Sequence, residues 1–378
     1  MTTKLTRIAT TVLIGLLFSG GLQAEEVRES AFIDGVPYRA MLDGFCAMSS
    51  LGMNLEHLGR PVAHAELLNM GWSYGFFVWP TETQYWAYPN TSPVEEIVFA
   101  AEQLGYDAEL YHHTDLEAAQ KTLVTHLTQG NPVIVQWIGH TVFAIGFEEG
   151  GEVIIYHDPS DPEVDISSEG TALTFSAAAS RSRVSNWDKP PYLWGEFGYL
   201  CMVLKPAATK KPVDWPAIWA KNAHKTLGKI KDPYPAHYGT DGLGVVIKDL
   251  KGKSFSGDDD LAAFLGQLEG LFYLGTGFRR EASAFLAGQA SVTDNTHLAD
   301  AAMAFRESAH VFRAGFGLIQ ELKKDSSRAS GTKAQIIRLL EILVKSETRG
   351  AESLLAAHET ERKAPPRKNI EPEAAVGS

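Results

Sequence analysis

The sequence predicts an α+β domain followed by an all-α helical domain. Apolar residues at helical spacing come first, strand-like runs follow between residues 133 and 204, and the chain after residue 212 is helical again. Helices that precede a run of strands favour an α+β arrangement over the alternation of a doubly wound α/β fold. About 350 residues remain when an N-terminal signal is set aside, which is enough for two domains.

The first helix is predicted over residues 45–58. Met48, Leu51 and Leu55 lie on one face of it, and a glycine and a proline follow its last turn. Two more helices are predicted over residues 93–104 and 115–127, each followed by a glycine that favours a helix end.

Strands are predicted from apolar runs that are bounded by turn residues. The runs cover residues 133–137, 142–147, 153–156 and 199–204. Glu149, Gly150 and Gly151 separate the second run from the third, so these two are predicted to form a hairpin. The last run is predicted to close the sheet.

The second half of the chain is predicted to be a helical bundle. Its helices are expected over residues 214–225, 243–250, 260–274, 297–322 and 333–358. Ile336, Leu340 and Leu343 form an apolar stripe, which is typical of a helix packed in a bundle. The predicted domains are residues 25–205 and 213–360, joined by a linker over 206–212, with a disordered tail over 361–378.

The N-terminus has the pattern of a secretory signal peptide. Lys4 and Arg7 precede an apolar run, and small and polar residues follow up to Ala24. We expect residues 1–24 to be removed and the mature chain to be periplasmic or secreted. The formal charge would then change from −12 to −14, because Lys4 and Arg7 are lost. A chain this acidic is not expected to bind nucleic acid, and we expect no stable membrane anchor.

The chain has two cysteines, and two interpretations of Cys46 stay open. In an oxidising compartment, Cys46 and Cys201 are candidates for a structural disulfide. Alternatively, Cys46 is a nucleophile, because it lies in the predicted first turn of a helix. Unpaired backbone N–H groups and the positive end of the helix dipole favour a thiolate there and offer donors to an oxyanion.

A thiolate nucleophile needs a base and a group that orients the base, and two later residues of the chain are candidates for these roles. His140 lies between two predicted strands, and Asp158 follows the next strand. If the hairpin pairs as its turn suggests, His140 and Asp158 lie at the same end of neighbouring strands. A cysteine on a helix, then a histidine on a strand, then an acid on the adjacent strand is the chain order of papain-like enzymes.

Several segments carry a resemblance to a known family. They are GFCAMSSLGMNLEHLG, GWSYGFFVWP and QGNPVIVQWIGHTVFAIGFEEGGEVIIYHDPS in the first half, and YGTDGLGVVIKDL and YLGTGFRREASAFL in the second. They resemble the butirosin-biosynthesis acyltransferase family, in which a domain related to papain-like peptidases of bacteriocin leaders is followed by a helical domain. The resemblance implies Cys46 as nucleophile, His140 as base and Asp158 as the residue that orients it.

The sequence departs from this pattern in one residue. Papain-like peptidases usually carry a glutamine about six residues before the nucleophile, as an oxyanion donor, and Ala40 stands there. The family transfers an acyl group from a carrier-protein thioester to an amine. Since carrier proteins are not expected outside the inner membrane, the acyl donor stays open.

An aromatic segment and two arginines each allow two interpretations. Trp72, Tyr74 and Phe76 are predicted to line a substrate pocket together with Gln136, or else to pack between the two domains. Gln136 and Tyr74 are also candidate oxyanion donors. Arg279 and its neighbour Arg280 are expected to bind a substrate carboxylate or to form surface ion pairs.

The sequence thus predicts an exported papain-like thiol enzyme that transfers acyl groups. Its partners would be a small-molecule or peptide acyl donor and an amine or water acceptor. No cofactor is expected, and the histidines lack the spacing of a metal site. The alternative is a non-catalytic binding module on the same fold, with Cys46 and Cys201 joined in a disulfide. The oligomeric state stays open.

Overall fold

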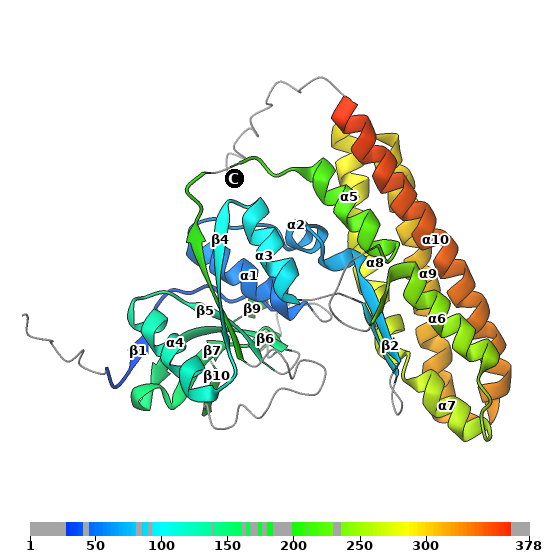
Figure 1. The fold of residues 1–378 in the computed structure, drawn as a ribbon, viewed down its shortest axis with the longest axis horizontal. Helices are drawn as coiled ribbons and strands as arrows, with labels where there is room; N and C mark the ends of the chain where they lie inside the picture. The colour runs from blue at the N-terminus through cyan, green and yellow to red at the C-terminus, as the bar shows by residue number, and fades with distance from the viewer. Residues whose placement is uncertain are drawn as a thin grey trace, which may run out of the picture.

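A computed structural model describes most of the chain, and it has the predicted α+β class with a helical second part (Figure 1). The described residues are 28–40, 45–80, 85–89, 93–137, 140–160, 164–166, 173–175, 180–183, 199–209, 211–229 and 236–363. The predicted signal at residues 1–24 and residues 364–378 of the predicted tail lie outside these ranges, whereas residues 361–363, predicted to be disordered, are helical. The domain limits at residues 205 and 213 stay predictions.

An antiparallel sheet forms the centre of the first part. In the described chain it has seven strands, of which six follow the order β10-β7-β6-β5-β11-β4, and the seventh, β1, pairs with β6 off this path. The strands are β1 (Ala31–Phe32), β4 (Tyr106–His113), β5 (Val133–Trp137), β6 (His140–Glu148), β7 (Val153–His157), β10 (Ser180–Arg183) and β11 (Tyr199–Pro206). The four predicted strands are confirmed within two residues, and β6 pairs with β7 as the turn at Glu149–Gly151 predicts.

Helices cover both faces of this sheet. The elements are α1 (Cys46–His57), α2 (His64–Asn69), α3 (Pro93–Gln103) and α4 (Leu116–Thr128). Alternation along the strands separates two cores. Ile134 and Met202 belong to the apolar cluster that contains α1 and α3, whereas their neighbours Val135 and Cys201 belong to the cluster that contains α4. The sheet therefore separates α1 from α4.

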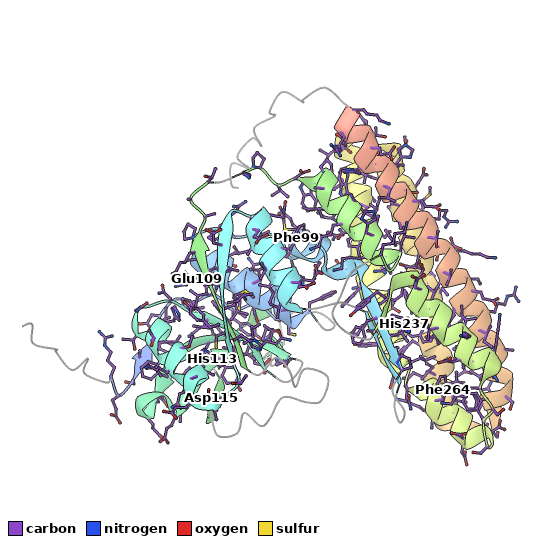
Figure 2. The ribbon with its side chains drawn as sticks, viewed as in Figure 1. Phe99, Glu109, His113, Asp115, His237 and Phe264 are labelled. Atoms are coloured by element: carbon purple, nitrogen blue, oxygen red, sulfur yellow. The ribbon has the colours of Figure 1, made fainter. Side chains whose placement is uncertain are left out.

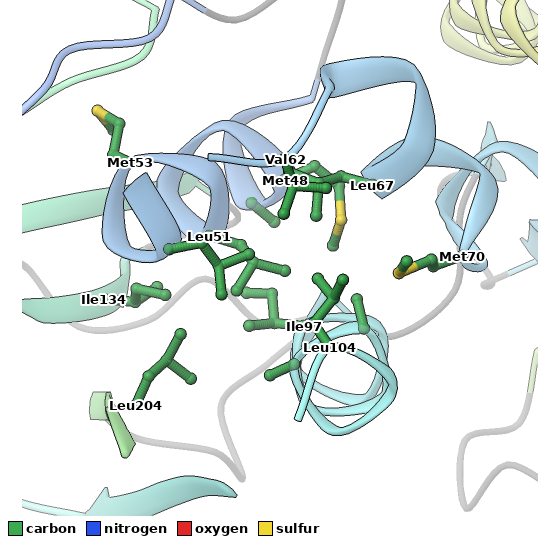
Figure 3. Packing of buried hydrophobic residues seen from close by; sticks show 14 of the residues in the cluster. Met48, Leu51, Met53, Val62, Leu67, Met70, Ile97, Leu104, Ile134 and Leu204 are labelled. Atoms are coloured by element: carbon green, nitrogen blue, oxygen red, sulfur yellow. The ribbon is translucent and has the colours of Figure 1, made fainter. Parts of the chain in front are cut away.

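The α1 face holds the larger of these two cores. Met48 and Leu51 of α1 pack near Ile97 of α3 and Ile134 of the sheet, as Figure 3 shows. Leu51 is fully buried, and burial of such a side chain contributes about 1.5–3 kcal/mol. The apolar residues whose spacing predicted a helix over residues 45–58 form the face of α1 that packs against the sheet.

Strand β4 was not predicted, because its sequence has no apolar run. Its side chains alternate irregularly between exposed and half-buried, and it is an edge strand that pairs only with β11 among the described strands. Charged side chains on an edge strand discourage pairing with other chains. They also interrupt the apolar pattern by which a strand is recognised in the sequence.

Six helices and a small sheet form the second part, which lies beside the first (Figure 1). The helices are α5 (Trp215–Thr226), α6 (Gly239–Gly252), α7 (Asp258–Gly266), α8 (Glu269–Thr293), α9 (Thr296–Lys324) and α10 (Ala329–Lys363). The prediction of a single helix over residues 260–274 is wrong, because a turn at Gln267 and Leu268 divides it. Phe264 of α7, labelled in Figure 2, belongs to the buried apolar cluster of these helices.

Helices α8 and α9 approach each other closely. A Cβ atom on Gly315 of α9 would overlap the ring of Phe272, and one on Gly275 of α8 would meet the ring of Phe312. Each glycine therefore makes room for an aromatic ring of the facing helix. This reciprocal packing lets two large rings fill the core between the helices.

A hairpin from the first half of the chain packs with the helical part. Strands β2 (Phe76–Pro80) and β3 (Tyr85–Pro89) pair with each other, and β2 also pairs with β12 (His237–Tyr238). Phe76, Val78 and Ala87 belong to the apolar cluster of the helices. A separate short pair joins β8 (Val164–Ile166) to β9 (Leu173–Phe175).

Buried ion pairs hold this segment in place. Arg279 of α8 donates from Nε and Nη2 to the Glu347 carboxylate of α10, both at 2.7 Å, and both side chains are buried. The same guanidinium donates to the carbonyl oxygens of Ser73 and Tyr74. Lys225 of α5 pairs with Glu96 of α3 and donates to the Gly71 carbonyl at 2.9 Å. Arg279 is therefore neither a ligand of a substrate carboxylate nor part of a surface ion pair, because it forms a buried ion pair and hydrogen bonds that join parts of the structure.

Within the described residues, no helix is long and apolar enough to cross a lipid bilayer.

We predict that Arg279→Leu strongly destabilises the protein. The substitution leaves the Glu347 carboxylate buried without its cation, which costs about 3–5 kcal/mol. Urea unfolding followed by circular dichroism measures the loss. The matched control is Arg280→Leu in the same helix, whose exposed pair with Glu281 contributes less than about 1 kcal/mol. Equal unfolding midpoints for the two variants would contradict the structural role of Arg279.

Candidate active site

Cys46 is the first residue of α1. Phe45 precedes it as the N-cap, and among the described residues no side chain caps this end. The Ser49 N–H donates to the Phe45 carbonyl at 2.9 Å, which is the first hydrogen bond of the helix. The N–H groups of Cys46, Ala47 and Met48 therefore have no acceptor within the helix. The thiol lies at a helix end with free donors, as predicted.

Side chains of α1 fix this end against strand β6. Ser50 Oγ donates to the Thr141 carbonyl at 3.3 Å, and both residues are buried. Because Thr141 follows His140, this contact sets the start of α1 beside the start of β6. The start of α1 carries Cys46, and an interaction with the Cys46 thiol is among the causes that raise the pKa of His140.

His140 and Asp158 lie together at one end of the sheet. His140 begins β6 and Asp158 follows β7, and the two strands are antiparallel neighbours. His140 Nε2 lies 2.7 Å from Asp158 Oδ1. The prediction that these residues lie at the same end of neighbouring strands is confirmed. Since Nε2 faces the carboxylate, Nδ1 is the nitrogen left for the thiol.

The Asp158 carboxylate and backbone are held by further hydrogen bonds. Ser160 donates to Oδ1 from its backbone N–H at 2.8 Å and from Oγ at 2.7 Å. Tyr38 Oη donates to the Asp158 carbonyl at 3.0 Å. Neither Tyr38 nor Ser160 was singled out from the sequence. The Asp-Pro-Ser turn was a usable signal for Ser160, because a side-chain oxygen of aspartate often accepts from the N–H two residues later.

The charges in the site follow from these contacts. Burial alone lowers the pKa of His140, but hydrogen bonds to Asp158 and Cys46 outweigh it and raise the pKa from 6.5 to about 10. Burial raises the pKa of Asp158, yet the hydrogen bonds from His140 and Ser160 bring it from 3.8 to about 2. At neutral pH the pair is therefore an imidazolium beside a carboxylate.

These shifts link the site to stability in opposite directions. The folded-state pKa of His140 is raised, so its stabilisation is full below pH 6.5 and is lost as pH rises through about 10. The folded-state pKa of Asp158 is depressed, so its stabilisation is full above pH 3.8 and is lost as pH falls through about 2. The ion pair is intact across the pH range between these limits.

A known family matches this part of the chain. Residues 33–179 match the model of the Peptidase_C39 like family. The match spans Cys46, His140 and Asp158, and it supports a papain-like domain related to cysteine peptidases, which indicates a cysteine-dependent enzyme of hydrolase type. None of the curated proteins that were compared matches the chain. The resemblance to the butirosin-biosynthesis acyltransferase family stays a prediction.

The two cysteines of this papain-like domain are free thiols, and they belong to opposite sides of the sheet. Cys201 lies on β11 in the cluster that contains α4, whereas Cys46 begins α1 on the other face. Burial raises the pKa of the Cys201 thiol to about 12, so it stays protonated and unreactive at neutral pH. The predicted disulfide alternative is therefore not what the structure contains, because the sheet lies between the two residues.

The predicted pocket residues have different surroundings. Tyr74 is fully buried, its Oη donates to Asn69 Oδ1 at 2.6 Å, and its ring meets Phe305 of α9 edge to face. Phe76 is buried against Phe312. Both rings thus pack between the two parts of the chain, as the second interpretation of the segment proposed. The side chain of Trp72 lies outside the described residues.

Gln136 lies on the same face of the sheet as α1. It is half-buried on β5, and its cross-strand partner is Thr141. Side chains two residues apart on a strand share a face, and Ile134 belongs to the apolar cluster that contains α1. Gln136 therefore stays a candidate donor or substrate contact beside the site. Arg39, the polar residue next to Ala40, is occupied elsewhere, since it pairs with Glu56 at 2.6 Å.

The helical part reaches the residue next to the nucleophile. The ring of Phe278 from α8 stacks on Phe45, with 4.5 Å between the ring centroids and 22° between their planes. The ring of His64 from α2 meets the Phe45 ring edge to face, with 5.7 Å between the ring centroids. The sequence gave no signal for this contact, because 233 positions separate two phenylalanines in unrelated segments.

No group of three potential metal ligands occurs among the residues that the structure describes.

We predict that Asp158→Asn lowers the pKa of His140 from about 10 toward or below its ordinary value of 6.5. The variant removes the carboxylate charge, while burial continues to oppose protonation of the ring. Titration of the His140 ring by NMR measures the change. Glu109→Gln is the control, since Glu109 lies on edge strand β4 and pairs with Lys205. An unchanged titration of His140 in Asp158→Asn would contradict the assigned pairing.

Proposed function

We propose that this chain is an exported thiol enzyme that transfers acyl groups through a thioester on Cys46. The observation that carries the proposal is the His140 ring, which begins β6 beside the start of α1 and lies 2.7 Å from Asp158 Oδ1. A nucleophile, an acid–base and an orienting carboxylate are the three groups that covalent acyl transfer needs.

The charge of His140 defines the first half of the reaction. Because the ring is protonated at neutral pH, its positive charge stabilises a thiolate at Cys46. The ring therefore does not act first as a base that removes the proton of the thiol. The thiolate attacks the acyl carbon and forms a C–S bond. As the tetrahedral intermediate collapses, the bond to the leaving group breaks and His140 donates its Nδ1 proton to that group.

The second half returns the enzyme to its starting state. The neutral His140 ring takes a proton from an amine or a water molecule, which attacks the thioester carbonyl. Cys46 leaves as a thiolate, and the ring is again an imidazolium. An amine acceptor gives an amide product, and a water acceptor gives a carboxylic acid, so the same residues serve transfer and hydrolysis.

The start of α1 supplies the oxyanion donors in this proposal. Ala40 has no side-chain donor, and Arg39 is engaged with Glu56 and the Val62 carbonyl. The free N–H groups of the first turn of α1 remain beside the thiol. Gln136 is the candidate for a second donor, because it lies on the face of the sheet that α1 covers.

The helical part borders the active site in this proposal. Phe278 stacks on Phe45, the residue directly before Cys46. A rigid aromatic contact at this point positions α8 to shape the approach of the acceptor. The binding-module alternative is weaker, because it depended on a Cys46–Cys201 disulfide and both thiols are free.

We predict that Cys46→Ala abolishes turnover and covalent labelling. The mature wild-type protein should take up one carbamidomethyl group from iodoacetamide under native conditions, because Cys201 is fully buried. Intact-mass spectrometry counts the groups, and a panel of acyl thioesters and peptide amides tests turnover. Cys201→Ala is the matched control and should behave as the wild type. Full turnover in Cys46→Ala would exclude the thioester route.

We also predict export with removal of residues 1–24. When the full-length chain is expressed in a bacterium with an outer membrane, intact-mass spectrometry of the periplasmic fraction should give a protein that begins at Glu25. Replacement of Leu16 and Leu17 by lysine interrupts the apolar run and should leave an uncleaved precursor in the cytoplasm. Recovery of the wild-type chain only as an uncleaved cytoplasmic protein would contradict export.

A further inference from the structure

The turn after β7 concentrates three hydrogen-bond donors on one oxygen atom. Asp158 Oδ1 lies 2.7 Å from His140 Nε2, 2.8 Å from the Ser160 N–H and 2.7 Å from Ser160 Oγ. Ser160 Oγ is also 3.4 Å from His140 Nε2. The four polar atoms of this small group therefore determine one another's positions.

Each hydrogen bond from Ser160 restricts a different motion. The bond from its N–H closes the turn from Asp158 to Ser160 and fixes the aspartate side chain relative to its own backbone. The bond from Oγ adds a second direction and leaves Oδ1 facing Nε2. At the other end, Tyr38 Oη holds the Asp158 carbonyl at 3.0 Å. The carboxylate that receives His140 is thus held through both its side chain and its backbone.

The hydrogen bonds also favour the charged form of Asp158. The Ser160 hydroxyl and N–H both act to lower the pKa of this carboxyl, in addition to His140 and against the effect of burial. A carboxylate that stays ionised and fixed is what keeps the imidazolium of His140 aligned with the thiol. The hydrogen bonds described for Ser160 go to Asp158 and His140, so Ser160 acts on the thiol only through these two residues.

We propose that Ser160 is a positioning residue of the active site, whose hydroxyl fixes the Asp158 carboxylate that aligns His140 with Cys46. This inference rests on the function proposed above. The competing explanation is that Ser160 only closes a surface turn. The two differ in one respect, because a turn needs the N–H of residue 160, whereas positioning needs its hydroxyl.

The chain contains a matched control for this distinction. Ser327 donates to Asp325 Oδ1 from its N–H at 3.2 Å and from Oγ at 2.6 Å. This is the same Asp-x-Ser arrangement, located between α9 and α10. Ser160→Ala and Ser327→Ala thus remove the same hydroxyl from the same kind of turn, one beside the active site and one in the helical part.

The experiment measures two quantities in the full mature chain. The first is the titration of the Asp158 carboxyl, followed by carbon-13 NMR. The second is the rate at which Cys46 displaces iodide from iodoacetamide at neutral pH, followed by intact mass. For Ser160→Ala we expect the pKa of Asp158 to rise and the alkylation rate to fall about tenfold, because the variant loses a hydrogen bond to a charged carboxylate. Ser160→Thr keeps the hydroxyl and should retain both values, and Ser327→Ala should match the wild type.

The outcomes separate this inference from the proposed function. If wild-type Cys46 reacts no faster than a thiol in the unfolded chain, the proposed function fails and the inference fails with it. If wild-type Cys46 reacts rapidly and Ser160→Ala matches Ser327→Ala in both measurements, the proposed function stands and the positioning role is overturned. Because Ser160 is exposed and Ser160→Ala retains the N–H, circular dichroism should give the wild-type spectrum for every variant.

Discussion

The antiparallel pairing of β6 with β7 is the constraint on which the candidate site depends. Phe143 opposes His157 in this antiparallel pair, so the first residue of β6 and the last residue of β7 lie at the same end of the two strands. This strand pairing brings His140 and Asp158 together, although nothing in the sequence around either residue identifies the other as its partner. Side chains alternate along a strand, so a shift of one residue would move His140 to the opposite face. The turn at Glu149–Gly151, with a positive φ at Gly150, sets the pairing beside it, and an irregularity between Ala144 and Gly146 shifts the register by one residue before the strands reach His140 and Asp158.

A second constraint joins the two parts of the chain. The segment around Ser73 and Tyr74 is covalently part of the first half, yet its carbonyl groups accept hydrogen bonds from Arg279 and its hairpin lies in the helical core. The same helix α8 that carries Arg279 also carries Phe278, which stacks on Phe45 beside the thiol. One helix therefore contributes to both the structural junction and the border of the site, so a loss of order at the junction would extend to the start of α1.

The site was more predictable from the sequence than the contacts around it, for a physical reason. Helix α1, the β6–β7 hairpin and the order of Cys46, His140 and Asp158 follow from local signals: apolar periodicity, a glycine turn and a helix start. In contrast, Arg279 and Glu347 are 68 positions apart, and nothing local in either segment identifies the partner. Tyr74 and Phe76 illustrate a different limit, since an aromatic ring suits a pocket wall and a packed interface equally well. Burial decides between them, and burial is a property of the whole fold.

The charge state of the site bears on the kind of acyl donor that suits it. With a carboxylate at Asp158 beside it, His140 already carries its proton at neutral pH before substrate arrives. Such a ring acts first as an acid, and its proton matters most when the leaving group is a strong base. An amine leaves an amide only when it is protonated, whereas a thiolate leaves a thioester with little help from an acid. Within the proposed function, a histidine held in the protonated form therefore favours amide donors over thioester donors, in agreement with the cysteine-peptidase character of the family that residues 33–179 match.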